Sequence, residues 1–109
     1  MTRTENASGI LIRIEQESLM YLMKRLNTTW YSTSKRAPFE RACEWPEIGC
    51  ECNEENACRI SFVSFYGLDL VGELPRAGLP HKLERVKIFD VGNNRLKGIV
   101  SNAFVRSFP

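Results

Sequence analysis

The sequence predicts a mixed α/β fold, in which a helical cap held together by disulfides precedes short strands that recur along the chain. Three observations support this prediction: an amphipathic helix pattern near the N-terminus, a cluster of cysteines in the middle, and two β-rich runs related by a shift of 26 residues. We therefore expect a cap over residues 1–58 and repeating strands over residues 59–109, where the last repeat is incomplete.

The composition is that of a chain that folds around one core. The 109 residues are 43% hydrophobic and 26% charged, which is too apolar for a disordered tail. A formal net charge of +2, with scattered basic residues, predicts no nucleic-acid partner. No apolar run approaches the roughly 20 residues that a membrane-spanning helix needs, so no membrane span is predicted.

Residues 15–26 form the predicted helix. Their apolar side chains recur at helical spacing, which predicts one buried stripe: Leu19, Leu22, Met23 and Leu26. Glu15 in the first turn and Arg25 in the last suit the helix dipole. The polar segment 31–42 is predicted to be a loop, with Trp30 and Trp45 flanking it as core anchors.

Four cysteines lie within a short segment: Cys43, Cys50, Cys52 and Cys58. An even number in a tight cluster favours two disulfides in an oxidising compartment. Zinc is disfavoured, because the C-x2-C and C-x4-C spacings of structural zinc sites do not occur here. Free thiols remain the alternative if the compartment is reducing. We predict no metal site and no cofactor.

Two sequons predict surface glycans on a secreted protein, at Asn6 and at Asn27. Chance occurrence is the alternative explanation for both. No secretory signal is visible, since the polar N-terminal residues precede only a short apolar stretch that Arg13 interrupts. The expected location is extracellular or at the cell surface, with the signal removed, and an intracellular location is the alternative.

The two β-rich runs indicate a repeat. The shift of 26 residues aligns apolar, arginine and glycine positions: Arg59 with Arg85, Ile60 with Val86, Val63 with Phe89, Phe65 with Val91, Leu70 with Leu96, Gly72 with Gly98 and Leu74 with Val100. The second copy fits L-x-L-x-x-N-x-L from Phe89 to Leu96. Alternate apolar side chains of such a strand fill a core, and the side chain of Asn94 can bond backbone groups where the chain turns. The first copy has Leu68 at the asparagine position, so its turn needs another source of stabilisation.

These residues resemble a leucine-rich-repeat protein of the plant or protist type. The segment from Cys43 to Cys50, with Trp45 inside it, is similar to the family's C-x-W-x-G-[apolar]-x-C cap, although Ile48-Gly49 departs from it by one place. The stretch from Arg59 to Pro75 resembles the family's first repeat. The resemblance covers residues 15–109 and implies a short right-handed solenoid with an N-terminal helical, disulfide-stapled cap. It also implies that Cys43 pairs with Cys50, with Cys52 and Cys58 as the second pair.

A solenoid of this kind implies a concave face that binds a protein partner. The strand alternation assigns five side chains to it: Phe62, Ser64, Tyr66, Ile88 and Asp90. The alternative is that the apolar members of this set only pack on the cap or on a neighbour that is missing from this sequence. At the other end, an uncapped repeat would expose Phe104, Val105 and Phe108, so we expect a fragment, a truncated gene product, or a chain that self-associates through this C-terminal edge.

No catalytic residue is predicted. His81 is the only histidine and lies in a segment with loop composition, so no catalytic triad is expected. We expect a non-catalytic protein-binding module, the N-terminal part of a receptor ectodomain or surface antigen. The rival hypothesis is a small intracellular assembly subunit with reduced cysteines, which docks on a larger complex.

Overall fold

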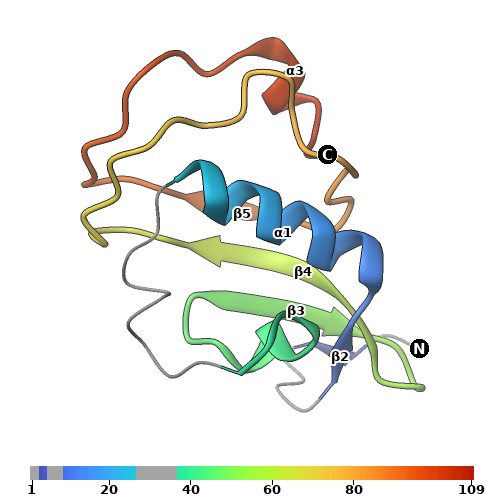
Figure 1. Ribbon diagram of the computed structural model, residues 1–109. Helices are drawn as coiled ribbons and strands as arrows, with labels where there is room; N and C mark the ends of the chain where they lie inside the picture. The colour runs from blue at the N-terminus through green and yellow to red at the C-terminus, as the bar shows by residue number, and fades with distance from the viewer. Residues whose placement is uncertain (1–2, 5–8, 27–36) are drawn as a thin grey trace.

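A five-stranded mixed sheet with a helix packed on one face forms the part of the protein that the computed structural model describes, residues 3–4, 9–26 and 37–109 (Figure 1). The strand order is β1-β3-β4-β2, and β5 also pairs with β4. The elements in chain order are β1 (Arg3–Thr4), β2 (Ile10–Leu11), α1 (Arg13–Arg25), the 3-10 helix η1 (Phe39–Glu44), β3 (Ile48–Cys52), β4 (Ala57–Ser64), β5 (Ile88–Asp90) and α3 (Asn102–Val105).

Helix α1 begins two residues before the predicted start, directly after β2. Ile12, its N-cap, has extended backbone and donates its N–H to the carbonyl of Cys58, so the chain passes from strand to helix without a loop. The predicted stripe is buried against the sheet, and Leu19, Leu22 and Leu26 are fully inaccessible. Tertiary packing of this stripe, more than capping, stabilises the helix, because the Ile12 side chain makes no cap hydrogen bond.

The expected loop over residues 31–42 is wrong in its C-terminal part, where η1 begins at Phe39. Trp45 ends this helix and is buried, and its indole Nε1 donates to the carbonyl of Ala37 at 2.8 Å. The indole also packs edge-on against Phe39. This anchoring explains why the segment coils into a helix instead of running free. Trp30 and both sequons, Asn6 and Asn27, lie outside the described residues.

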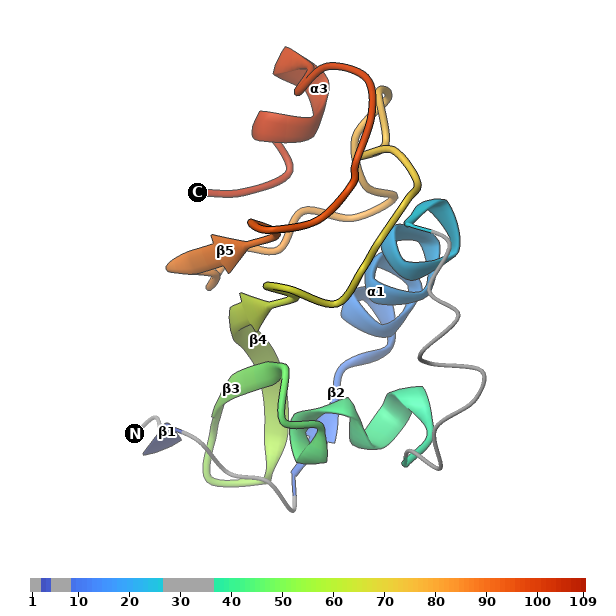
Figure 2. The ribbon, with the colours of Figure 1, turned by 90° about the vertical axis from the view of Figure 1, so that its left-hand side faces the viewer.

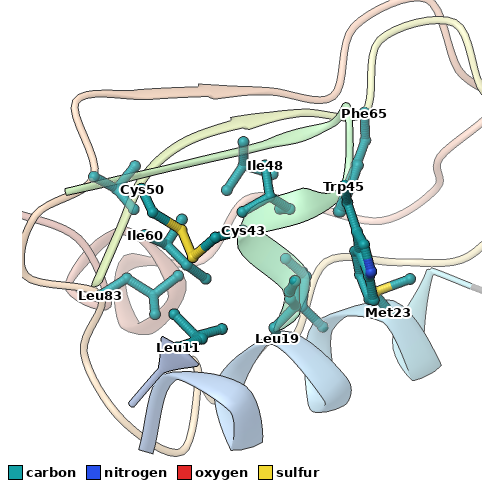
Figure 3. Close-up of a cluster of buried hydrophobic side chains, with 14 of the residues drawn as sticks. Leu11, Leu19, Met23, Cys43, Trp45, Ile48, Cys50, Ile60, Phe65 and Leu83 are labelled. Carbon is teal, nitrogen blue, oxygen red and sulfur yellow. A yellow bond between two sulfur atoms is a disulfide. The ribbon is translucent and has the colours of Figure 1, made fainter. Parts of the chain in front are cut away.

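The predicted disulfide bonding is confirmed, and the pairs are Cys43–Cys50 and Cys52–Cys58. The first disulfide joins η1 to β3 inside the core, next to Ile60 and Leu11 (Figure 3). The second links two residues that face each other across β3 and β4. Two disulfides in a small domain indicate an oxidising, extracellular-type environment.

Strand β4 lies at the centre of the sheet. It pairs antiparallel with β3, and Ser61 forms a bulge, since Cys50 opposes Ile60 whereas Gly49 opposes Phe62. The bulge shifts the alternation of side chains by one residue, so that Ile60 and Val63, three residues apart, are both buried in the core. The strand runs through the boundary expected between residues 58 and 59, so the cap and the following strands share one sheet.

Strand β5 pairs with β4 in parallel, and Phe62, Val63 and Ser64 oppose Ile88, Phe89 and Asp90. Each pair is 26 residues apart, the shift that aligns the two β-rich runs. The pairing continues beyond the strands, through bonds from Gly67 N–H to the carbonyl of Gly92, from Arg95 N–H to that of Leu70 and from Lys97 N–H to that of Gly72. We call residues 61–72 the first rung and residues 87–98 the second rung. Figure 2 shows the two segments side by side after β4 and β5.

Asn94 joins the two rungs through its side chain. Its Oδ1 accepts from the N–H groups of Leu68 and Leu70 in the first rung, at 3.0 Å each. Its Nδ2 donates to the carbonyls of Phe65, Val91 and Gly92 at 2.7 to 3.0 Å. The first rung, which has Leu68 in place of an asparagine, is therefore stabilised by the asparagine of the second.

We predict that the unreduced protein carries two disulfides and no free thiol. Its intact mass is expected about 4 Da below that of the reduced form, because each disulfide lacks two hydrogens. Alkylation before reduction should add nothing, and peptide mapping should recover Cys43 with Cys50. Four alkylated cysteines in freshly isolated native protein would contradict both pairings.

We also predict that Asn94→Ala destabilises the domain. The substitution leaves several part-buried backbone groups without their partner, which costs about 2–4 kcal/mol of unfolding free energy. Urea denaturation measures the loss. Asn102→Ala is the matched control, since this exposed residue should change the unfolding free energy by less than about 0.5 kcal/mol. Equal effects of the two substitutions would show that Asn94 does not join the rungs.

Candidate functional site

The residues that alternate away from the core along β4, β5 and the two residues after each strand form one surface, here called the outer face: Phe62, Ser64, Tyr66, Ile88, Asp90 and Gly92. Their neighbours Val63 and Phe65 are fully buried, whereas Tyr66 is 57% and Ile88 53% exposed. The parallel register sets Phe62 beside Ile88 and Ser64 beside Asp90. The structure thus brings the predicted binding residues together on one side of the sheet.

Two glycines make room for the aromatic rings of this face. A Cβ on Gly49 would lie 3.0 Å from the Cβ of Phe62, and a Cβ on Gly92 would lie 3.2 Å from Cδ2 of Tyr66. The Phe62 side chain therefore covers the β3 backbone, and the Tyr66 ring lies over the second rung. This contact accounts for the half-burial of Phe62 and leaves Tyr66 as the more exposed aromatic group.

Charged groups flank the apolar centre of the outer face. At one end Lys87 bridges to Glu51 of β3 at 2.8 Å, and at the other Asp90 accepts from Gly92 N–H at 2.9 Å. Both interactions hold charged side chains in place beside exposed apolar groups. A rigid sheet with an apolar centre and a charged rim suits contact with another protein.

The repeat-frame residues differ between the two rungs. Val63, Phe65 and Leu70 of the first rung are fully buried. Their counterparts in the second rung are only partly buried against the core: Phe89, Val91 and Leu96. The second rung is covered on one side only, and on its other side lies a groove of about 370 Å³. Its lining includes Phe89, Val91, Val100, Phe104, Val105 and Phe108.

Glu15 is the residue that sequence reasoning missed. Its carboxyl is fully buried, and Oε1 accepts from Ile60 N–H of β4 at 2.6 Å. Oε2 accepts no hydrogen bond in the described part of the chain and lies 3.7 Å from Nη1 of Arg59. Burial raises the pKa of the Glu15 carboxyl from 4.5 to about 7, against the opposing effects of the Ile60 hydrogen bond and Arg59. The sequence shows only a first-turn acid, which is ordinary on an exposed helix.

His81 contacts two residues of α1, and neither contact pairs its imidazole ring with a nucleophile. Its Nε2 lies 2.8 Å from Glu17 Oε1, and the hydroxyl of Ser18 donates to the backbone carbonyl of His81. Because Ser18 contacts the backbone and not the ring, the three residues form no nucleophile–base pair. This arrangement ties the loop around His81 to the helix.

Residues 3–4, 9–26 and 37–109 contain no cluster of three or more histidine, cysteine or acidic side chains that could hold a metal ion. In the same residues, every helix is too short or too polar to cross a membrane. Comparisons with protein families, with curated proteins and with solved structures give no match, so any assignment depends on the residues themselves.

We predict that Glu15 makes stability fall as pH rises. The folded-state pKa of about 7 lies above the ordinary 4.5, so the folded state binds the proton more tightly. The stabilisation is full below pH 4.5 and is lost as pH rises through 7, with a total of about 3 kcal/mol. Urea unfolding between pH 4 and 8.5 should show this slope.

Glu15→Gln should flatten this slope, because the amide keeps an acceptor for Ile60 N–H and carries no charge. Glu55→Gln, an exposed residue, is the control and should leave the slope unchanged. Identical pH profiles for the wild type and Glu15→Gln would exclude Glu15 as the cause.

Proposed function

We propose that this chain is a non-catalytic, protein-binding module of leucine-rich-repeat type, from a secreted or cell-surface protein, and that its outer face contacts the partner. The observation that carries the proposal is the stacking of two rungs in parallel at a spacing of 26 residues, joined by one asparagine. A period of about 20–29 residues and an asparagine at the turn are typical of leucine-rich repeats.

The geometry of the outer face supports binding over chemistry. Ile88 is exposed on β5, and Tyr66 is exposed in the turn after β4, between Phe65 and Gly67, whose N–H groups bond the second rung; little conformational entropy is therefore lost when a partner docks. Tyrosine side chains combine apolar area with a hydroxyl and are enriched among residues that dominate binding energy. Asp90 supplies a charge beside them that can select the partner.

The disulfides favour the extracellular version of this function over an intracellular assembly subunit. Cys50, Cys52 and Cys58 are at most 1% exposed, and the two disulfides link η1 to β3 and β3 to β4. Reduced cysteines would remove both cross-links from a small core. An intracellular protein would need a fold that stays stable with its cysteines reduced. Thermal unfolding with and without reductant measures how much stability the disulfides contribute.

We predict that Tyr66→Ala and Asp90→Lys weaken partner binding without unfolding the domain. The expected loss is roughly tenfold or more in Kd for each, because both side chains lie on the face that meets the partner. The measurement is a screen of purified extracellular proteins against the immobilised domain, followed by titration of any protein that binds.

Lys82→Ala, an exposed substitution away from β4 and β5, is the control and should leave the Kd unchanged. Circular dichroism spectra should match for all variants. A partner that binds the two outer-face variants as tightly as the wild type would show that binding occurs elsewhere.

A further inference from the structure

Three residues of the outer face lie around one point: Tyr66, Asp90 and Gly92. Gly92 carries no side chain, and a Cβ built on it would lie 3.1 Å from Oδ1 of Asp90 and 3.2 Å from Cδ2 of Tyr66. The carboxylate and the aromatic ring therefore both lie beside the direction in which a side chain at position 92 would point. We call these three residues the Gly92 cradle. A group that approaches the sheet along this direction meets the ring and the carboxylate together.

The Asp90 carboxylate has room for a further partner. Its Oδ1 accepts from Gly92 N–H at 2.9 Å, and its Oδ2 accepts no hydrogen bond from residues 3–4, 9–26 and 37–109. The basic residues that precede and follow it most closely, Lys87 and Arg95, are paired with Glu51 and Asp69 at 2.8 Å each. Within the described part of the chain, the negative charge of Asp90 is therefore left without a cation.

A partner that covers the outer face has to compensate this charge. Tyr66 is 57% and Ile88 53% exposed, and Asp90 follows Ile88 by two residues on the same face. A partner that buries the two apolar side chains therefore also removes water from the Asp90 carboxylate. A carboxylate buried without a compensating charge destabilises a complex strongly. An apolar or acidic partner surface is thus disfavoured at this point, and a cationic one is favoured.

We propose that the Gly92 cradle binds an arginine side chain of the protein partner. The guanidinium group donates to the Asp90 carboxylate and lies against the Tyr66 ring, and the methylene stem packs on Ile88. Arginine suits this site better than lysine, because its planar group stacks on aromatic rings and presents several donors to one carboxylate. The inference rests on the proposed function and adds the chemistry of the partner.

The first experiment needs no identified partner. The full chain, isotopically labelled for NMR, is titrated with N-acetyl-arginine amide and separately with N-acetyl-citrulline amide, which has a similar shape and no charge. The arginine probe should shift the amide signals of Asp90 and Gly92 with a Kd in the millimolar range, because one side chain covers little surface. The citrulline probe should bind roughly tenfold more weakly, and added salt should reduce the difference.

Gly92→Ala tests the geometry, since it keeps both the ring and the carboxylate. The added methyl group would lie 3.1 to 3.2 Å from both, tighter than ordinary van der Waals contact, so it would obstruct the approach between them. The arginine probe should bind this variant roughly tenfold more weakly. The fold should be retained, because the Tyr66 side chain is exposed and can move aside.

Substitutions of the two side chains test the chemistry. Asp90→Asn removes the charge and should weaken the arginine probe roughly tenfold, whereas Tyr66→Phe keeps the ring and should leave its Kd unchanged within about twofold. Asp69→Asn is the matched control, because Asp69 is already paired with Arg95 and its positive φ of 59° is one that asparagine tolerates. This control should bind the arginine probe as tightly as the wild type.

Three results would overturn the inference. One is equal affinity for the arginine and citrulline probes. Another is arginine binding that Gly92→Ala and Asp90→Asn both leave unchanged. The third is a wild-type dimer in sedimentation equilibrium that Asp90→Asn dissociates, since a second copy of the chain would then occupy this face.

The inference and the proposed function fail separately. A protein partner that Tyr66→Ala weakens, together with an arginine probe that does not bind, would retain the outer face as the binding surface and exclude the arginine. Arginine binding at the Gly92 cradle, together with a protein partner that Tyr66→Ala and Asp90→Lys leave unaffected, would support the cation site and place the protein partner elsewhere.

Discussion

One edge of β4 has to satisfy three partners in succession, and the rest of the domain is arranged around it. Strand β2 bonds this edge at Ala57 and Cys58, the Glu15 carboxyl at Ile60, and the second rung from Ser61 onward. A central strand cannot leave its N–H and C=O groups unpaired in the core. The carboxyl therefore fills the gap between two parallel partners, which sets the position of α1 and of β5.

This arrangement separates a rigid surface from a more open one. The outer face includes β4, which is paired on both edges and linked to β3 by the Cys52–Cys58 disulfide, so its backbone is held in place. Strand β5 pairs with β4, whereas the groove beside it is open, and the aromatic side chains of the groove are only partly buried.

Local patterns made much of this predictable. The apolar stripe of α1, the cysteine cluster and the spacing between the two rungs are all visible in the sequence, since each reflects one periodicity or one chemistry. The burial of Glu15 could not be predicted, because it depends on where β2 and β5 end along β4. That position is set by tertiary packing and leaves no local pattern in the sequence. Two-residue strands such as β2 carry no periodic signal.

Asn94 has a consequence for the order of folding. Helix α1 and the β3–β4 hairpin are built from contacts close in sequence, so they can form early. The hydrogen bonds from Asn94 to Phe65 and Leu68 span 29 and 26 residues. Closing this loop costs chain entropy before the hydrogen bonds can stabilise it. The turn of the first rung is therefore complete only when the second rung has folded beside it. Residues 1–86 alone would lack the hydrogen bonds that Asn94 makes to this turn.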